Sequence, residues 1–578
     1  MKNRQVARVF NEIANLLEIK GENPFRVRAY RRAAQNIEGL SKDVAEISPE
    51  ELRKIPGIGE DLAQKIAEIA RTGTIRLYEQ LKSEVPQGLS LLLQVPGLGP
   101  KTAKLLYEKL GVKSVQELEA LAREHKLRGL PGIQAKTEEN ILKGIQMLKR
   151  SKERQPLGKV LPLAQDLMEH LGRAAPVKKL CVAGSLRRAK ETIKDIDLLA
   201  TSEEPMAVMN AFVHLPHVRE VLLKGPTKSS VVLEEGIQVD LRVVEEDSFG
   251  AALAYFTGSK AHNIRIREMA LKAGLKVNEY GIFDERGKKL GGAREEDVYR
   301  LLGLPYIPPE LREDRGEIEA ALEGRLPRLL ELQDILGDLH VHSRYSDGSH
   351  RLPELVQAAR DRGYAYIAIT DHSKGLGVAK GLTAERLMEQ IREIEALNRK
   401  LRGFRVLTGV EVDIRSDYTL DLPDEVLARL DVVNASIHSG FRQSREQLTR
   451  RLVSAMKNPY VNIIAHPTGR LLGERDAYEL DIQEVLRTAK ETSTALEINA
   501  YPMRLDLNDT HARMAKEMGI PLVISTDTHL LAQYEFMHYG VSIARRAWLR
   551  KEDILNSLPL KALLQALRRK RPQRATTR

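Results

Sequence analysis

The chain has 578 residues, of which 42% are hydrophobic and 30% are charged, and its formal net charge is +11. A single hydrophobic core cannot serve this length, so we expect roughly three to five domains. The sequence has no run of about 18 apolar residues, and residues 1–4 lead into a mixed helix, so we expect neither a membrane span nor a secretory signal. The single cysteine, Cys181, excludes an intramolecular disulfide and a cysteine-rich zinc site, and is typical of a reducing cytoplasm.

Residues 1–150 have helical periodicity, and the excess of positive charge favours a polyanionic partner. Three similar pieces recur there, each with an apolar residue, Pro, Gly, a turn and a helix: 55–69 (IPGIGEDLAQKIAEI), 95–111 (VPGLGPKTAKLLYEKLG) and 130–145 (LPGIQAKTEENILKGI). Glycine lets the backbone approach a phosphate, and the helix behind it offers free N–H groups and the positive end of its dipole.

These pieces resemble helix-hairpin-helix elements, which bind the DNA backbone without reading bases. The residues expected to contact DNA are Gly57, Gly59, Gly97, Gly99 and Lys101. A single such turn also occurs in unrelated proteins, and two copies about forty residues apart are a stronger signal. The third piece lacks the second glycine and is either a further contact or purely structural.

Lys65 lies in the helix after the first of these turns. A lysine amine can attack the aldehyde of an abasic sugar to form a Schiff base, but an exposed helical lysine without any such role is the alternative interpretation.

Three aspartates form a candidate metal-binding group. Asp195 and Asp197 lie in an apolar run within 180–200 (LCVAGSLRRAKETIKDIDLLA), and Asp240 lies in a second run, 237–244 (IQVDLRVV). If both runs are strands, Asp195 and Asp197 point to the same side, and Asp240 can join them from a neighbouring strand. Such carboxylates repel one another unless cations lie between them, and three can hold two Mg²⁺ or Mn²⁺ ions for phosphoryl transfer. The alternative is a surface pair of aspartates at a strand end.

Polar groups suited to a nucleotide surround the aspartates. Gly184 and Ser185 end an apolar strand and open a turn with Arg188, which forms a small phosphate cradle. Segment 255–274 (YFTGSKAHNIRIREMALKAG) begins with two aromatics and a glycine turn and continues as a helix. Asn263 and Arg267, four residues apart, share one face of that helix, from which they can reach the minor-groove edge of a base pair.

In order and spacing, these motifs, together with 29–34 (AYRRAA) and 278–283 (NEYGIF), resemble a family X DNA polymerase of the β type in its bacterial form, over residues 1 to about 315. The resemblance implies that Asp195 and Asp197 bind both metals and that Asp240 binds the catalytic metal. It implies that the incoming dNTP is held by Gly184, Ser185, Arg188, Arg154, Tyr255, Phe256, Gly258, Lys260, Asn263 and Arg267. Lys65 falls on the lyase position.

Two departures from the family pattern matter. Lys260 stands where the β-type enzyme has an acidic residue, so the nucleotide contacts there should differ. Asp61 stands where a supporting lysine is expected, which leaves the 5′-deoxyribose phosphate lyase activity open.

Histidines crowd the carboxy-terminal half, where nine of the fourteen lie from His340 onward. Strand-like runs alternate with helical stretches and end in His, Asp or Glu, which predicts an α/β barrel whose strand ends share one rim. The predicted metal ligands on that rim are His340, His342, Asp347, His372, Glu411, His438, His466, Asp527 and His529. A single histidine at a strand end is usually structural, but six with three carboxylates at comparable positions favour a metal site. These donors suit up to three Mn²⁺ or Zn²⁺ ions.

This pattern resembles the polymerase and histidinol phosphatase (PHP) domain, a distorted barrel of seven strands and helices, over about 335–572. The resemblance implies metal-dependent hydrolysis of a phosphodiester or phosphomonoester. Arg470, close after His466, is expected either to hold a phosphate or to be a surface arginine.

The expected architecture is multidomain, with a helical DNA-binding part, an α+β palm and thumb, and a distorted (β/α)7 barrel. The predicted ranges are a lyase-like domain (1–85), fingers (86–150), a nucleotidyltransferase palm (151–247), a thumb (248–315), a linker (316–334) and a PHP domain (335–572). We expect a monomeric cytoplasmic, nucleoid-associated enzyme without membrane contact.

The expected activity fills short gaps in primer-template or gapped DNA with dNTPs during repair, including base-excision repair. A metal-dependent 3′–5′ exonuclease is expected to accompany it, with 3′-phosphatase or AP endonuclease activity left open. The alternatives are a polymerase with a non-catalytic barrel and a DNA-end-binding module.

Overall fold

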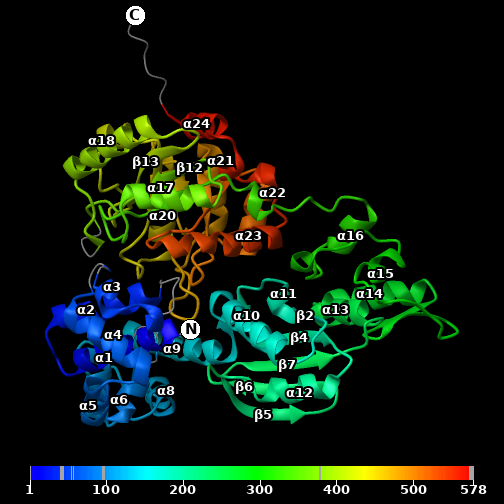
Figure 1. Ribbon diagram of the computed structural model, residues 1–578. Coiled ribbons are helices and arrows are strands. Elements are labelled where there is room, and N and C mark those ends of the chain that lie inside the picture. The colour runs from blue at the N-terminus through cyan, green and yellow to red at the C-terminus, as the bar shows by residue number, and fades with distance from the viewer. Residues whose placement is uncertain are drawn as a thin grey trace, which may run out of the picture.

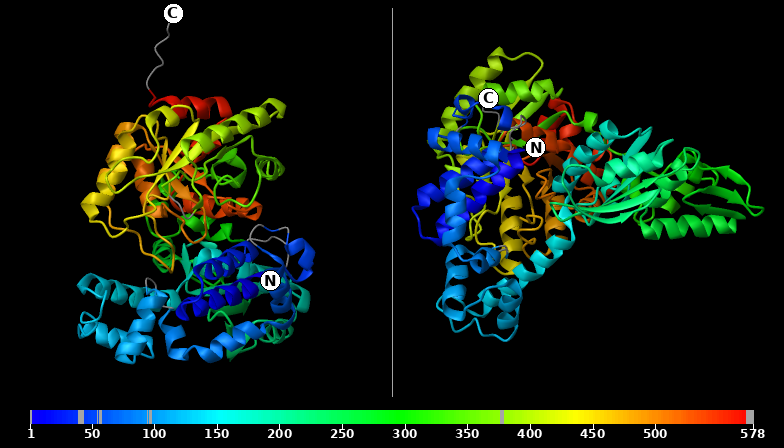
Figure 2. Two further views of the ribbon diagram at one scale, coloured as in Figure 1. Left: turned by 90° about the vertical axis from the view of Figure 1, so that its left-hand side faces the viewer. Right: turned by 60° about the horizontal axis from the view of Figure 1, so that its bottom comes forward.

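The computed structural model describes residues 2–38, 44–53, 55, 58–93, 95, 98–375 and 379–571. Two of the predicted hairpin glycines, Gly57 and Gly97, lie outside these residues. The amino-terminal helices lie on one side of the palm and the thumb on the other, and the barrel lies above them (Figure 1). In Figure 2, the left-hand view again shows the barrel above the amino-terminal helices, and the right-hand view shows the palm and thumb extending to the side away from those helices.

The amino-terminal part is helical, and its apolar residues form two separate cores. The first core gathers residues between Val6 and Leu89, and the second gathers residues between Leu92 and Ile145. The main helices are α1 (Lys2–Ile19), α2 (Pro24–Glu38), α4 (Glu60–Thr72), α5 (Arg76–Glu84), α7 (Pro100–Leu110), α8 (Val115–Arg123) and α9 (Ala135–Glu153).

The palm is a five-stranded sheet with strand order β2-β4-β7-β6-β5. Its strands are β2 (Lys179–Val182), β4 (Asp195–Thr201), β5 (Val218–Lys224), β6 (Lys228–Leu233) and β7 (Gln238–Val243). Strands β4 and β7 run parallel, and the other neighbours pair antiparallel. In β4 the side chains of Ile196 and Leu198 are buried, whereas Asp195 and Asp197 are half-buried. This alternation puts the two carboxylates on one side of the strand, away from the palm core formed with helices α10 (Leu157–Ala174) and α12 (Pro205–Val213).

The thumb follows with helices α13 (Phe249–Thr257), α14 (Lys260–Lys272) and α15 (Glu296–Arg300) and the strands β8 (Leu275–Asn278), β9 (Gly281–Asp284) and β10 (Lys289–Gly291). The end of the predicted thumb and the beginning of the predicted linker both pack into the thumb core. Ile307, Leu311 and Ile318 are buried in the thumb core, and helix α16 (Glu317–Leu322) begins with Glu317, whose carboxylate lies 2.7 Å from His262 Nδ1.

Seven parallel strands form the carboxy-terminal domain, in chain order from β11 to β17. They are β11 (Gly337–Val341), β12 (Tyr366–Ile369), β13 (Arg405–Asp413), β14 (Val432–Ser436), β15 (Ile463–Ile464), β16 (Ala495–Asn499) and β17 (Leu522–Ser525). A parallel bridge between Val341 and Thr528 joins the last strand to the first, so the predicted distorted seven-stranded barrel is confirmed.

Helices surround the barrel: α17 (Leu352–Asp361), α18 (Ala384–Lys400), α19 (Asp424–Leu427), α20 (Arg445–Lys457), α21 (Ile482–Thr492), α22 (Asp509–Glu517), α23 (Met537–Arg546) and α24 (Leu560–Arg568). None of the helices in the described part of the chain is long and apolar enough to cross a membrane.

The palm and the barrel share one continuous cluster of buried apolar residues, which extends from Leu157 to Ile554. Gly158 of α10 packs so closely on the barrel that a Cβ added there would lie 2.1 Å from the Cβ of Pro502. Arg470 Nη2 donates to Glu191 Oε2 of the palm over 2.8 Å, and the arginine is 9% exposed. Arg470 is therefore a buried bridge between domains, and the alternative of a surface arginine is wrong.

Candidate active sites

The three aspartates of the palm come together on two neighbouring strands. Parallel pairing of β4 with β7 places Asp197 directly opposite Asp240 and Asp195 opposite Gln238. Gln238 Nε2 donates to Asp240 Oδ1 over 2.9 Å, and Lys228 Nζ lies 4.0 Å from Asp240 Oδ2.

The crowding of these carboxylates is visible in the pKa of Asp197. Burial, followed by the neighbouring charges of Asp195 and Asp240, raises it to about 7. A cation between the carboxylates would remove this penalty, and oxygen ligands of this kind suit Mg²⁺ or Mn²⁺. The arrangement therefore fits a divalent-metal site.

Gly184 is required by the same cluster. It has φ of +60°, and a Cβ at this position would lie 2.0 Å from Asp197 Oδ2. The Asp197 carboxylate thus packs directly against the backbone of Gly184, at a position that leaves no room for a side chain.

The remaining cradle residues lie around this turn. Ser185 Oγ is buried and has no hydrogen-bond partner among the described residues, so it is free to bind a ligand. Arg154 donates to Thr192, from Nε to Oγ1 over 3.0 Å and from Nη2 to the carbonyl oxygen over 2.5 Å. Arg188 donates from Nε to Glu313 Oε1 over 3.0 Å and from Nη1 to the Thr257 carbonyl oxygen.

The predicted thumb residues lie at the junction of α13 and α14. Tyr255 and Phe256 meet edge to face with ring centroids 5.2 Å apart, and the Arg242 guanidinium of the palm lies 4.4 Å from the Phe256 ring centroid. A Cβ at Gly258 would lie 3.3 Å from Arg188 Nη1, so this glycine lets the thumb approach the cradle.

The three predicted nucleotide-binding residues of α14 differ in their surroundings. Lys260 is exposed at the start of the helix, where its charge is accessible. Asn263 Nδ2 donates to the Tyr255 carbonyl oxygen over 2.7 Å, and Arg267 Nε donates to the Asn263 carbonyl oxygen over 3.4 Å.

One backbone hydrogen bond recurs in all three hairpin copies. The amides of Ile58, Leu98 and Ile133 each donate to the carbonyl oxygen three residues earlier, over 3.0 Å. The third copy thus keeps this hydrogen bond although it lacks the second glycine.

Helices α4 and α7 begin after Gly59 and Gly99, and neither glycine supplies a side-chain cap. A Cβ on either glycine would meet no atom of the described residues within 4 Å, so packing among those residues does not require the glycines. Lys101 is exposed in the first turn of α7. Exposed amides and open space suit an external phosphate.

Lys65 is held by two side chains. Its Nζ lies 2.9 Å from Tyr30 Oη and 2.6 Å from Asp61 Oδ2. Burial lowers the pKa of Lys65, but the hydrogen bonds to Asp61 and Tyr30 outweigh it and leave the pKa above its ordinary value. The amine is therefore protonated at neutral pH, which opposes a role as nucleophile.

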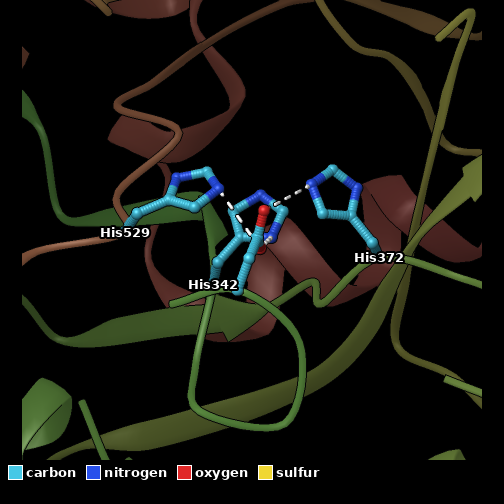
Figure 3. Close-up of side chains that lie close together, drawn as sticks. His342, His372 and His529 are labelled. Carbon is cyan, nitrogen blue, oxygen red and sulfur yellow. Dashed lines mark ion pairs between the residues drawn. The ribbon is translucent and has the colours of Figure 1, made fainter. Parts of the chain in front are cut away.

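The structure brings the nine predicted donors of the barrel together at the carboxyl ends of the strands. Figure 3 shows the rings of His342, His372 and His529 converging on one point. Asp347 lies among them, with Oδ1 3.4 Å from His529 Nε2 and Oδ2 3.6 Å from His372 Nε2.

Two buried carboxylates connect the histidines into one cluster. Glu411 Oε2 lies 2.8 Å from His372 Nδ1, and its Oε1 lies 2.9 Å from His466 Nε2 and 3.2 Å from His438 Nε2. Asp527 Oδ1 lies 3.2 Å from His342 Nε2 and 3.6 Å from His340 Nε2. Eight of the nine donors form three overlapping groups, each compact enough for one metal ion, and His466 lies beside them against Glu411.

The free donor atoms of this cluster fit metal ions. Burial, together with the neighbouring His529 and His372, lowers the pKa of His342 to about 3, so its ring is neutral and able to coordinate. Burial also disfavours the charged forms of His438 and His529, but the carboxylates beside them outweigh it and raise both pKa values to about 9, so these rings would lose a proton when a metal ion binds. Buried donor atoms without a hydrogen-bond partner among the described residues include His340 Nε2, both ring nitrogens of His342, His372 Nδ1 and Glu411 Oε2. His466 and Asp527 have φ of +30° and +56°, a strained backbone often found at functional sites.

Sequence reasoning missed the residues that orient these donors. Six of the seven strands lead to predicted donors, and the seventh, β16, carries Glu497, which is fully buried. Glu497 Oε1 lies 2.7 Å from His340 Nδ1, and Oε2 accepts from the His466 amide over 2.7 Å. A carboxylate behind a ligating histidine fixes its ring and tautomer. Arg504, whose Nε lies 3.6 Å from Asp527 Oδ2, was also missed.

One relative matches almost the whole chain. The protein named DNA polymerase/3′–5′ exonuclease PolX of Bacillus subtilis (strain 168) is 42% identical over 572 residues, which are 98% of this chain and 100% of that protein. The chain belongs to the PolX family. Its resemblance to the bacterial family X polymerases is thereby confirmed.

Family models divide this PolX family member into recognisable parts. They match a helix-hairpin-helix domain (residues 1–75), a SAM-like helix-hairpin-helix tandem (89–147), a DNA polymerase beta thumb (252–313) and a PHP domain (338–501). Rattus norvegicus DNA polymerase lambda is 27% identical over 343 residues, 54% of this chain and 56% of that protein. A probable phosphatase of Thermoanaerobacter sp. (strain X514) is 29% identical over 231 residues, 38% of this chain and 89% of that protein.

Proposed function

We propose that this chain is a DNA polymerase that fills short gaps in DNA repair and carries a 3′–5′ exonuclease in its barrel. The observation that carries the polymerase is the parallel register that sets Asp197 opposite Asp240 beside the Gly184 turn. The complete set of nine donors on the barrel rim supports the exonuclease.

In the palm, Asp195, Asp197 and Asp240 hold two Mg²⁺ or Mn²⁺ ions, which supply electrostatic stabilisation for transfer of the nucleotide. Ser185, Arg188 and Arg154 bind the triphosphate, and the amides around Gly184 add to this cradle. From the thumb, the aromatic pair packs near the sugar, and Asn263 and Arg267 face the minor groove of the nascent base pair. Lys260 adds a positive charge near the nucleotide.

In the barrel, the nine donors hold up to three Mn²⁺ or Zn²⁺ ions, which supply Lewis acidity toward the phosphodiester of a 3′ end. Glu497 orients His340 through its Nδ1 atom, and Arg504 is placed to contact a phosphate next to Asp527. Removal of 3′ phosphates is a second candidate activity, favoured by the probable phosphatases that match the barrel over most of their length.

The hairpin turns at Gly59 and Gly99, with Lys101, hold the duplex by its phosphates, and Gly57 and Gly97 belong to the same two motifs. The chain is proposed to act as a monomer on gapped or primer-template DNA in the cytoplasm, at the nucleoid.

Crossed substitutions on one substrate test both assignments. On a one-nucleotide gap with dNTPs and Mg²⁺, Asp240→Ala should lower extension by about 10³-fold or more and leave Mn²⁺-dependent primer degradation intact. His342→Ala should do the reverse. Equal extension by the wild type and Asp240→Ala overturns the polymerase site, and persistent degradation by His342→Ala overturns the exonuclease site.

A further inference from the structure

A chain of alternating charges connects the nucleotide cradle to the barrel. Arg188 pairs with Glu313, Glu313 pairs with Arg546 at the end of α23, and Arg546 pairs with Asp509 at the start of α22. The Arg546 side chain is 3% exposed, and those of Arg188 and Glu313 are each 11% exposed. Burial on this scale makes each pairing geometrically specific.

Arg546 contacts Arg188 and Glu313 at the same time. Its Nη1 donates to the Arg188 carbonyl oxygen over 2.7 Å and to Glu313 Oε1 over 3.0 Å, and its Nη2 donates to Asp509 Oδ2 over 2.9 Å. Helix α23 packs on β16 and β17, so the barrel holds this guanidinium in place (Figure 1).

The contacts of Arg188 show what this arrangement achieves. Glu313 engages only its Nε, the Thr257 carbonyl oxygen engages Nη1, and Nη2 has no hydrogen-bond partner among the described residues. A carboxylate alone with an arginine favours a two-bond fork that uses two guanidinium nitrogens. Because Glu313 Oε1 is shared with Arg546, the carboxylate binds Arg188 through one nitrogen and leaves Nη2 for a phosphate.

We propose that Arg546 of the barrel is a positioning residue of the polymerase, which restrains Glu313 so that Arg188 stays available to the incoming triphosphate. This inference rests on the proposed polymerase function. Without Arg546, Glu313 would be left with Arg188 as its main partner and would compete with the nucleotide for it. The exonuclease, whose donors lie on the barrel rim, does not use Arg546.

The chain offers a matched control in the neighbouring residue. Arg545 on the same helix also fixes the barrel to the preceding segment, with Nε donating to Glu310 Oε1 over 2.6 Å and Nη1 donating to the Leu330 carbonyl oxygen over 3.1 Å. It has no contact with Arg188 or Glu313 among the described residues. Arg545→Met therefore reports the cost of loosening the interface alone.

The test measures KM for the dNTP and kcat on a one-nucleotide gap. The exonuclease rate of the same protein sample is measured in parallel. Arg546→Met should raise KM about tenfold and change kcat and the exonuclease rate less than about twofold, because a buried charge partner is lost but no reacting group. Arg545→Met should leave KM within about twofold of the wild type. Adding Glu313→Gln to Arg546→Met should restore KM to within about threefold of the wild type, because the competing charge is gone.

An unchanged KM in Arg546→Met, an equal rise in Arg545→Met, or no rescue by Glu313→Gln overturns the inference. Where Arg546→Met does not fold, Arg546→Lys serves instead, with a rise of about threefold expected because an ammonium keeps the charge but not the fork. A wild-type chain that extends no primer overturns the proposed function itself, whereas normal extension with an unchanged KM overturns only the role of Arg546.

Discussion

The palm and the barrel both gather metal-binding side chains at strand positions, but they do so in opposite ways. The palm site has three carboxylates, half-buried on two strands of an open sheet. The barrel site has six histidines and three carboxylates on a closed rim, where His340, His342 and Glu411 are almost completely buried. The palm thus leaves most coordination positions to the substrate, whereas the barrel supplies most of them from the protein.

This difference matches the chemistry of the two sites. A polymerase site that binds its metal together with a triphosphate needs few protein ligands, because Mg²⁺ is commonly held by one or two carboxylates and the substrate phosphates. A hydrolytic site that attacks a DNA phosphodiester has no such chelating substrate. It therefore needs metals that the protein holds before the DNA arrives.

The largest expected effect is a difference in metal retention. After dialysis without chelator, the barrel ions should remain and the palm ions should be lost, since we expect dissociation constants that differ by about 10³-fold or more. Metal content per chain, measured by mass spectrometry, should fall in His342→Ala and match the wild type in Asp240→Ala. Loss of the retained ions in Asp240→Ala instead would reverse the comparison.

Gly184→Ala should damage only the palm. The added Cβ collides with Asp197 Oδ2, so one carboxylate must move, and polymerase kcat/KM should fall about 10²-fold. Steady-state extension measures this, and the exonuclease rate should not change. Gly172→Ala is the matched control in the same domain, because a Cβ there meets no atom within 4 Å. Equal activity of the two variants would show that the turn and the aspartate can separate freely.

The smallest expected effect concerns a third potential site, at Lys65. Removing the Asp61 carboxylate takes away a contact that raises the pKa of Lys65, so the neutral amine becomes more abundant at pH 7 to 8. Borohydride trapping of Lys65 on 5′-deoxyribose phosphate DNA should therefore rise about fivefold. Asp61→Ala is compared with Glu60→Ala, a change at a neighbouring exposed carboxylate. A trapped product that persists in Lys65→Ala would assign the reaction to another amine.

Several features could be predicted because they depend on local periodicity. Alternation along a strand puts Asp195 beside Asp197, and parallel strands of one barrel bring His340 and Asp527 to the same rim although they are far apart in sequence. An α/β barrel and the helical amino-terminal part follow from the same patterns, whereas the number of seven strands came from the resemblance to the PHP domain.

Other features depend on how domains pack, which periodicity does not encode. Glu497 was missed because its role depends on contacts with His340 and His466, which lie on other strands of the barrel. The partners of Arg470 and Arg546 are in the palm and at the end of the thumb, and only the docking of the barrel brings them together. Tyr30 meets Lys65 through the packing of α2 against the hairpin domain, and this contact changes the expected reactivity of the lysine.

The apolar cluster shared by the palm and the barrel also has a consequence for heat denaturation. Domains with separate cores can melt one at a time, whereas domains that share a core unfold as a single cooperative unit. The two amino-terminal cores are separate and can melt on their own, but the palm and barrel should lose their structure at one temperature. Synthesis and trimming of DNA would then fail together on heating, so a chain that still extends primers would still be able to trim them.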